Sequence, residues 1–345
     1  MARDRCIFIS NTMRAGSSYL SRILSAHPNI SMSYDTVNFF RFCHHRYDPI
    51  EKEENFVQLI SDISLRLNDR FKIPLDINKC IESVGDKEYS YATAYWGVLR
   101  TIFPDSEKTI LGDKESLAWT KIPAFLEMFP NGKAIILVRD PRDVVSSFKK
   151  ITIAPENDYL IALFDAVDAV NHAVRYSARY PNNVHMVKFE ELKMDSERVV
   201  KKICKFLEID FSIDMLDVNK YTDHFGEKWD SILSRSCPEE TNPLAAVGRW
   251  KHKISNDDLL LCEWIAKKQI SMMGLSLSGQ KFSQEDFNSA MRKILSSPLL
   301  RSAFKNWCET GEGVEKFPLD PINPANWEPS SSPKKAAIVS DRQFS

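Results

Sequence analysis

Long apolar runs are missing from this 345-residue chain. A membrane-spanning helix needs about 20 consecutive and mostly apolar residues, and no stretch here comes close to that length. The first apolar segment begins at Cys6, which leaves no room for a signal peptide before it. We therefore expect neither a membrane span nor a leader.

An excess of charge of either sign is also missing. The chain has 46 Lys and Arg against 47 Asp and Glu, for a formal net charge of −1. This balance argues against bulk electrostatic binding to nucleic acid and against a polybasic membrane anchor. Local basic pockets remain compatible with it.

Cysteine is sparse and unclustered. The seven cysteines show no Cys-x-x-Cys spacing, so neither a zinc site nor a redox pair is indicated, and we expect no metal site. Scattered cysteines of this kind are typically reduced thiols, which predicts a cytoplasmic location.

The first segment that carries chemistry is the turn from Asn11 to Ser18. The apolar run 6–9 predicts a buried strand, and residues 17–26 carry apolar side chains at helical spacing. The turn between them places backbone N–H groups and hydroxyls at a helix N-terminus, where anions bind. An ordinary nucleotide-triphosphate loop reads G-x-x-x-x-G-K-[ST]; here Asn11 replaces the first Gly, Ser17 replaces the Lys, and the cation is Arg14. This is either an altered phosphate cradle or a serine-rich turn before a surface helix.

A second anion-binding candidate follows the apolar segment 133–138. Continuous apolar residues predict a strand covered on both faces, with Arg139 at its end and Ser147 in the next helix. Arg offers a planar fork for phosphate and Ser adds a neutral donor, so both can hold one anionic group. Arg142 is either a further phosphate ligand or part of a helix-start charge cluster with Asp140 and Asp143.

Two more polar residues follow predicted strands. Residues 109–116 predict a buried strand that ends in a polar turn with Lys114, and a Lys at the carboxyl end of a parallel strand points into the crevice where α/β proteins bind ligands. Asp35 follows the short strand 29–32. The alternatives are a solvated surface Lys and a turn-capping Asp.

Taken in order, these segments resemble the sulfotransferases that use 3′-phosphoadenosine 5′-phosphosulfate (PAPS), especially the bacterial and tyrosylprotein-type enzymes. The resemblance implies a P-loop-nucleotide-kinase-like α/β fold with a parallel β-sheet flanked by helices. It also implies a base at Asp35, where the family more often has Glu, a Lys114 that faces the transferring sulfuryl group, and an Arg14 that compensates charge on the leaving phosphate. The implied cofactor contacts are Arg14, Ala15, Gly16, Ser17, Ser18, Tyr19, Arg139, Ser147, Phe189, Gly248, Arg249 and Trp250.

Two of these assignments depart from the family pattern. Phe-Glu-Glu-Leu at 189–192 resembles the family's Tyr-Glu-Asp-Leu, whose aromatic residue lies beside the adenine, but a core Phe189 fits equally well. The segment 248–251 resembles G-x-W-[KR], yet the Arg-Lys-Gly that precedes it in classical cytosolic enzymes is replaced by Pro243-Leu244-Ala245. Arg249 or backbone N–H groups would then complete the 3′-phosphate site.

We predict a sulfotransferase domain over 1–280, in which 36–108 is a variable acceptor-binding helical region. A C-terminal helical extension follows over 281–317, with one helical stretch at 283–307, and then a Pro/Ser-rich, flexible tail over 318–345. Residues 256–273 predict a single amphipathic helix, and 210–242 a polar lid. The aromatic residues at 39–47 line an acceptor pocket or belong to the core, and His44 and His45 are alternative bases.

The predicted reaction moves a sulfuryl group from PAPS to a hydroxyl or amine of an acceptor such as a carbohydrate, lipid, small metabolite or peptide tyrosine. Two alternatives stay open: an ATP-dependent small-molecule kinase and a non-catalytic nucleotide-binding scaffold. Against a kinase stand the missing loop Lys and the lack of a strand-end Asp for Mg²⁺, apart from Asp113. Neither the acceptor nor the oligomeric state follows from the sequence.

Overall fold

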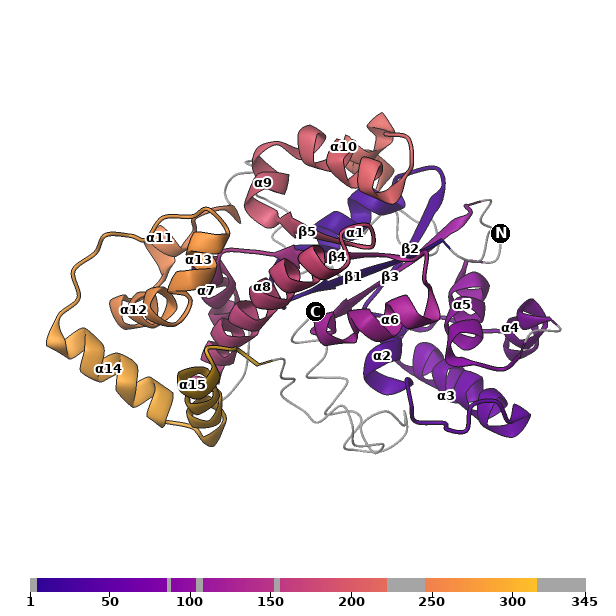
Figure 1. The fold of residues 1–345 in the computed structure, drawn as a ribbon, viewed down its shortest axis with the longest axis horizontal. Helices are drawn as coiled ribbons and strands as arrows, with labels where there is room; N and C mark the ends of the chain where they lie inside the picture. Colours follow the sequence, from indigo (N-terminus) through magenta and orange to yellow (C-terminus); the bar gives the residue numbers. More distant parts are fainter. Residues whose placement is uncertain (1–4, 86–87, 104–107, 152–155, 222–245, 315–345) are drawn as a thin grey trace.

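A parallel five-stranded sheet forms the centre of the molecule (Figure 1). The computed structural model describes residues 5–85, 88–103, 108–151, 156–221 and 246–314. The strands are β1 (Cys6–Asn11), β2 (Ile30–Tyr34), β3 (Ile110–Ser116), β4 (Lys133–Val138) and β5 (Val184–Lys188), in the spatial order β2-β3-β1-β4-β5. Every pairing is parallel, so all strands end at the same edge of the sheet. The predicted α/β fold with a parallel sheet flanked by helices is confirmed.

Side chains alternate across the sheet and build two separate cores. In β1, Cys6 and Phe8 face one core, while Ile7 and Ile9 face the other. This alternation is the period of a strand with both faces covered. The same rule decides which residues at the strand ends can share a site.

Helices cover both faces. The core of Ile7 and Ile9 is closed by α1 (Ser17–Ser25), α9 (Phe189–Met194) and α10 (Ser196–Leu207), which Figure 1 shows together on one side of the sheet. The other core is closed by α2 (Phe39–Phe42), α3 (Glu53–Phe71), α4 (Ile77–Val84), α5 (Tyr91–Ile102), α6 (Ile122–Met128), α7 (Pro141–Ile151) and α8 (Ile161–Arg179). Short 3₁₀ turns lie at Trp119–Lys121, Asp158–Leu160, Ile213–Leu216 and Val218–Lys220.

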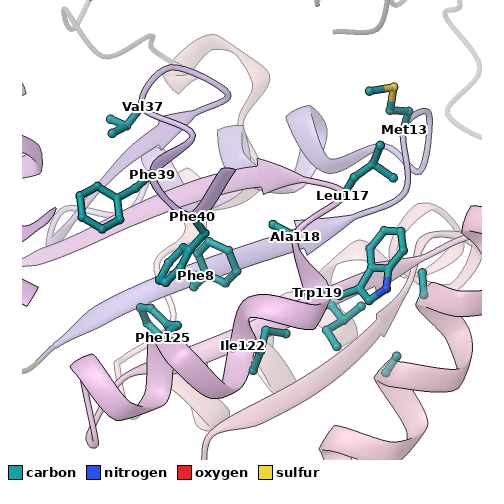
Figure 2. Packing of buried hydrophobic residues seen from close by; sticks show 14 of the residues in the cluster. Phe8, Met13, Val37, Phe39, Phe40, Leu117, Ala118, Trp119, Ile122 and Phe125 are labelled. Carbon is teal, nitrogen blue, oxygen red and sulfur yellow. The ribbon is translucent and has the colours of Figure 1, made fainter. Parts of the chain in front are cut away.

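Phe8 lies at the centre of the larger core (Figure 2). Its ring stacks on Phe125 of α6 and meets Phe40 of α2 edge to face, with 5.2 Å between ring centroids in each pair. Aromatic pairs at this spacing add to the free energy gained by burial. They attach α2, which follows Asp35 in the chain, to the middle of the sheet.

Two predicted single helices are each broken in two. The segment 256–273 forms α12 (Asn256–Ile265) and α13 (Lys267–Met272) after the short α11 (Trp250–Lys253), and 283–307 forms α14 (Gln284–Leu295) and α15 (Pro298–Thr310). The second break has a clear cause, because Ser297 caps α15 through the Leu300 N–H and Pro298 occupies its first turn. Among the described helices, none is long and apolar enough to cross a membrane. The predicted tail and most of the predicted lid lie outside the described residues.

Candidate functional site

The turn between β1 and α1 has the form of an anion cradle. It bends through Arg14 at φ 68° and Gly16 at φ 92°, and the Ala15 N–H donates to the Thr12 carbonyl at 3.1 Å. No side chain caps the amino end of α1, so the N–H groups of Ser17 and Ser18 point out of the first turn without an intrahelical acceptor. A helix end built this way favours a phosphate or sulfate group.

Phe189 packs directly on this turn. Its ring lies where a Cβ on residue 16 would be, so Gly16 is required both by its positive φ and by the aromatic contact. The ring also contacts the guanidinium of Arg139, 4.5 Å from the ring centroid. Phe189 is buried and holds the turn against the end of β4.

Arg139 connects three segments of the site. Its guanidinium donates to the carbonyl oxygens of Arg14, at 2.8 Å, and of Ala246. Its Nε–H is buried and has no hydrogen-bond partner in the described part of the chain. A buried donor without an acceptor costs free energy, which an anion bound beside it would recover. Arg14 in turn donates from Nε to the Ser147 hydroxyl at 3.2 Å, so the structure brings together the predicted Arg14, Arg139 and Ser147.

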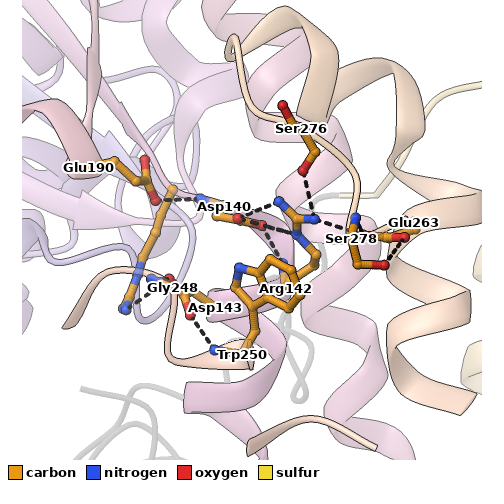
Figure 3. A network of polar contacts seen from close by, with 10 residues as sticks. Asp140, Arg142, Asp143, Glu190, Gly248, Trp250, Glu263, Ser276 and Ser278 are labelled. Atoms are coloured by element: carbon orange, nitrogen blue, oxygen red, sulfur yellow. Dashed lines mark hydrogen bonds and ion pairs between the residues drawn. The ribbon is translucent and has the colours of Figure 1, made fainter. Parts of the chain in front are cut away.

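The segment 248–250 is held by a carboxylate that the sequence did not single out for this role. Asp143 of α7 accepts from the N–H of Gly248 at 2.7 Å and from the N–H of Trp250 at 2.9 Å (Figure 3). These bonds fix the chain on either side of Arg249, next to the cofactor-binding candidates. Gly248 has φ 71°, the left-handed region that favours glycine.

Arg142 belongs to a structural ion-pair network. It pairs with Asp140 at 2.9 Å and with Glu263 of α12 at 2.7 Å, and its guanidinium stacks on the Trp250 ring at 4.0 Å (Figure 3). The interpretation as a charge cluster at the helix start therefore holds. Trp250 is buried against this arginine, which leaves its predicted cofactor contact untested.

Asp35 and Lys114 form an ion pair at the carboxyl edge of the sheet. Lys114 is 2% exposed and Asp35 22%, so the carboxylate is the more accessible partner. Asp35 has φ 53°, and its backbone N–H donates to the Lys114 carbonyl at 2.7 Å. The alternative of a solvated surface Lys is wrong for Lys114.

Ser116 joins this pair to the turn between β1 and α1, a link that sequence reasoning missed. Its N–H donates to Asp35 Oδ1 at 3.1 Å, and its hydroxyl accepts from Asn11 Nδ2 at 3.3 Å. Asn11 also donates to the Thr12 carbonyl at 2.6 Å. The residue that replaces the first glycine of an ordinary loop thus ties the turn to the strand that carries Lys114.

Asp113 and Glu115 face away from this site. Residues alternate along β3, so both point into the larger core, where they surround Tyr95. Burial raises the pKa of Asp113 to about 6 and that of Glu115 well above its usual range. The only strand-end carboxylate considered for Mg²⁺ is therefore buried on the wrong face, which removes that support for a kinase.

The histidines of the aromatic segment lie beside the core. His44 contacts the rings of Phe40 and Tyr91, and burial, aided by the charge of His45, lowers its pKa to about 4. His45 is exposed and pairs with Asp48 at 3.1 Å. Three of the aromatic residues, Phe39, Phe40 and Phe42, are core residues.

Comparisons with known proteins agree with this geometry. A model of the sulfotransferase family matches residues 6–212. Protein-tyrosine sulfotransferase from Drosophila melanogaster is 24% identical over 261 residues, covering 73% of this chain and 48% of the fly protein, so the chain spans about half the length of that relative. Sulfotransferase 2A6 from Mus musculus is 27% identical over 208 residues, covering 52% of this chain and 72% of the mouse protein.

Among solved structures, the sulfotransferase domain from the curacin biosynthetic pathway aligns with a TM-score of 0.50 at 18% identity. The alignment covers 79% of this chain and 98% of that domain, and at this identity it shows a shared fold. The family match, which spans all five strands of the sheet, shows more: this chain belongs to the sulfotransferase family.

Proposed function

We propose that this enzyme transfers a sulfuryl group from PAPS to a hydroxyl or amine of an acceptor. The observation that carries the proposal is the Asp35–Lys114 ion pair, tied through Ser116 to the turn that carries Arg14. It places a carboxylate and a buried ammonium next to an anion cradle. Loose in-line transfer needs positioning and charge compensation, which this arrangement supplies.

The residues present fit the donor. The N–H groups of Ser17 and Ser18, with the Arg14 side chain, would hold the 5′-phosphosulfate end, while Tyr19 and Phe189 flank the turn. Arg139 has a buried Nε–H that lacks an acceptor, and Ser147 lies one hydrogen bond from Arg14; these groups suit the 3′-phosphate. Arg249, between two bonds that Asp143 accepts, is the nearby candidate for completing that site.

Asp35 acts as the base in this proposal. When bound, PAPS supplies the sulfuryl group, which moves to the acceptor atom as its bond to the 5′-phosphate breaks. Asp35, the more exposed partner of the pair, takes the acceptor's proton. The Lys114 side chain compensates the negative charge that develops on the transferring and leaving oxygens.

The acceptor side is proposed in coarser terms. Residues 36–108 form the acceptor-binding helical region of a 1–280 catalytic domain, with 281–317 as an extension. The fly relative is described as a protein-tyrosine sulfotransferase, which makes peptide tyrosine one class to test beside carbohydrates, lipids and small metabolites. A cytoplasmic location remains a prediction from the cysteine pattern.

A panel of labelled donors tests the proposal. The purified protein is incubated with ³⁵S-labelled PAPS or γ-³²P-labelled ATP and with sugars, phenols, lipids and peptides. We expect sulfate transfer from PAPS and no phosphate transfer. Phosphate transfer would contradict the proposal in favour of a kinase, and nucleotide binding without turnover of any acceptor would favour a scaffold.

A further inference from the structure

The hydroxyl of Ser116 lies between the turn and the Asp35–Lys114 pair. It accepts a hydrogen bond from Asn11 Nδ2 at 3.3 Å, and Asn11 is the last residue of β1 before the turn. The backbone N–H of Ser116 donates to Asp35 Oδ1 at 3.1 Å. One small residue at the end of β3 therefore contacts both the proposed base and the segment that leads into the turn.

Ser116 points to the same side of β3 as Lys114. Residues two apart in a strand share a face, whereas Glu115 between them accepts from the Phe40 N–H inside the larger core. Lys114 reaches Asp35 on this side of the strand, and it is almost fully buried. Ser116 is the one residue of β3 that is partly exposed, so a bound molecule can reach it.

Backbone contacts on both sides fix the position of this hydroxyl. Ser116 and Asn11 are direct partners in the pairing of β3 with β1. The next residue, Leu117, has φ 56° and donates its N–H to the Asn11 carbonyl at 2.9 Å. A polar group that is already held in place loses little conformational freedom when it binds a ligand.

The Ser116 hydroxyl still has a hydrogen bond to give. A serine hydroxyl carries one donor and two acceptor sites, and here one acceptor site is used by Asn11. Within the described residues its own hydrogen has no acceptor; the nearby Asn11 Oδ1 is buried there without any hydrogen bond. An unused donor beside the turn and the base suits a negatively charged oxygen of a ligand.

We propose that the Ser116 hydroxyl donates to an oxygen of the transferring sulfuryl group, which makes Ser116 a further catalytic residue. The inference rests on the proposed use of PAPS. A sulfuryl group whose phosphate is held at the turn, and which meets an acceptor next to Asp35, lies beside Ser116 because this residue contacts both parts. Its hydroxyl would add one neutral donor to the charge of Lys114.

Calorimetry with two nucleotides tests the inference without turnover. PAPS and its product 3′-phosphoadenosine 5′-phosphate (PAP) differ in the sulfuryl group, so the ratio of their affinities measures contacts to that group. We expect Ser116→Ala to weaken PAPS binding roughly tenfold, as for a lost hydrogen bond to a charged group, and to leave PAP binding unchanged. Ser116→Thr keeps the hydroxyl and should keep the wild-type ratio. Ser302→Ala, on an exposed position of α15, is the matched control and should behave as wild type.

A variant of Asn11 distinguishes a sulfuryl contact from support of the turn. Asn11→Ala removes the bond to Ser116 and the bond to the Thr12 carbonyl, but it leaves the Ser116 hydroxyl in the chain. It should weaken PAPS and PAP binding alike, because both nucleotides use the turn. A selective loss of PAPS affinity in Asn11→Ala and not in Ser116→Ala would overturn the inference.

The outcomes separate the two proposals. If wild type binds PAPS and PAP more tightly than AMP, but Ser116→Ala keeps the wild-type ratio of PAPS to PAP affinity, the inference is wrong while the use of PAPS stands. The same holds if Ser116→Ala weakens binding of both nucleotides alike. If wild type binds PAPS and PAP no more tightly than AMP, the proposed use of PAPS is wrong and the inference fails with it.

Discussion

The two sides of the Asp35–Lys114 pair are built differently. On the proposed cofactor side, defined by the turn 14–19, Arg139, Ser147 and residues 246–250, donors converge, and Arg139 Nε has no acceptor in the described part of the chain. On the proposed acceptor side, polar side chains next to Asp35 hold the protein backbone. Arg66 donates to the carbonyls of Thr36 and Val37 at 2.8 and 2.6 Å.

This difference separates groups that could bind a ligand from groups that hold the protein backbone in place. The buried Arg139 Nε–H fits a bound anion, because a buried donor without an acceptor costs free energy that an anion would recover. Side chains that have partners hold the backbone. Glu115 accepts from the Phe40 N–H at 3.1 Å, and Asn38 donates to the Asp35 carbonyl at 2.8 Å. The segment that follows Asp35 therefore keeps this residue in its left-handed conformation, and the rings of Phe39, Phe40 and Phe42 belong to the core.

The largest expected effect on stability comes from removing an aromatic ring of the segment that follows Asp35. Phe40→Ala removes a ring that packs on Phe8 and Phe125, and we expect it to lower the free energy of unfolding by about 3–5 kcal/mol. Urea denaturation measures it. Leu65→Ala, an exposed apolar residue of α3, is the control and should change stability by less than about 0.5 kcal/mol. If Phe40→Ala is as stable as the control, the segment is not core and the comparison of the two sides fails.

The pair itself is tested by Lys114→Met, which keeps most of the volume and removes the charge. Loss of one donor to developing negative charge typically costs about 10²–10³ in kcat, or about 2.7–4 kcal/mol. Single-turnover transfer from labelled PAPS measures it, with Lys205→Met on α10 as the control. Normal turnover in Lys114→Met would exclude its role in charge compensation.

Arg139 sharpens the comparison on the cofactor side. We expect Arg139→Ala to weaken PAP binding by about 1.5–3 kcal/mol while AMP binding changes little, because its buried Nε–H suits an anion. Calorimetry measures both affinities, and Arg292→Ala on α14 should leave them unchanged. Equal losses for PAP and AMP would show that Arg139 only holds the turn through the Arg14 carbonyl.

The smallest effect concerns Glu190, which accepts from the Asp140 N–H at 2.8 Å behind Arg139. Burial raises its pKa to about 7, so the folded state prefers the neutral acid. The free energy of unfolding should therefore fall as the pH rises from the unfolded pKa, near 4.5, to about 7, and level off above it.

Glu190→Gln is neutral at every pH and should remove this slope, stabilising the protein by about 1–3 kcal/mol at pH 8. Thermal unfolding at pH 5 and pH 8 compares it with wild type and with the exposed Glu197→Gln. A slope that persists in Glu190→Gln would assign the pH dependence to other groups.

The sequence predicted those parts of the site that depend on neighbours along the chain. Arg14 and Arg139 follow strands and Lys114 lies near the carboxyl end of β3; parallel strands bring these ends to one edge, so their convergence was predictable. The break between α14 and α15 was missed because apolar residues continue on both sides of Ser296 and Ser297.

Contacts between distant segments could not be read in advance. Asp143 binds Gly248 and Trp250, 105 and 107 residues away, and Phe189 fills the space above Gly16. Nothing in the local pattern distinguishes such a carboxylate from one that caps its own helix, because the partner is set by tertiary packing.

The most direct test of the account is the identity of the base. Once an acceptor is known, kcat and PAP affinity are measured for Asp35→Asn and for His44→Gln. We predict that Asp35→Asn loses about 10²–10⁴ in kcat with PAP affinity preserved, while His44→Gln turns over normally. Normal turnover in Asp35→Asn together with an inactive His44→Gln would place the base in the aromatic segment and contradict the role assigned to the Asp35–Lys114 pair.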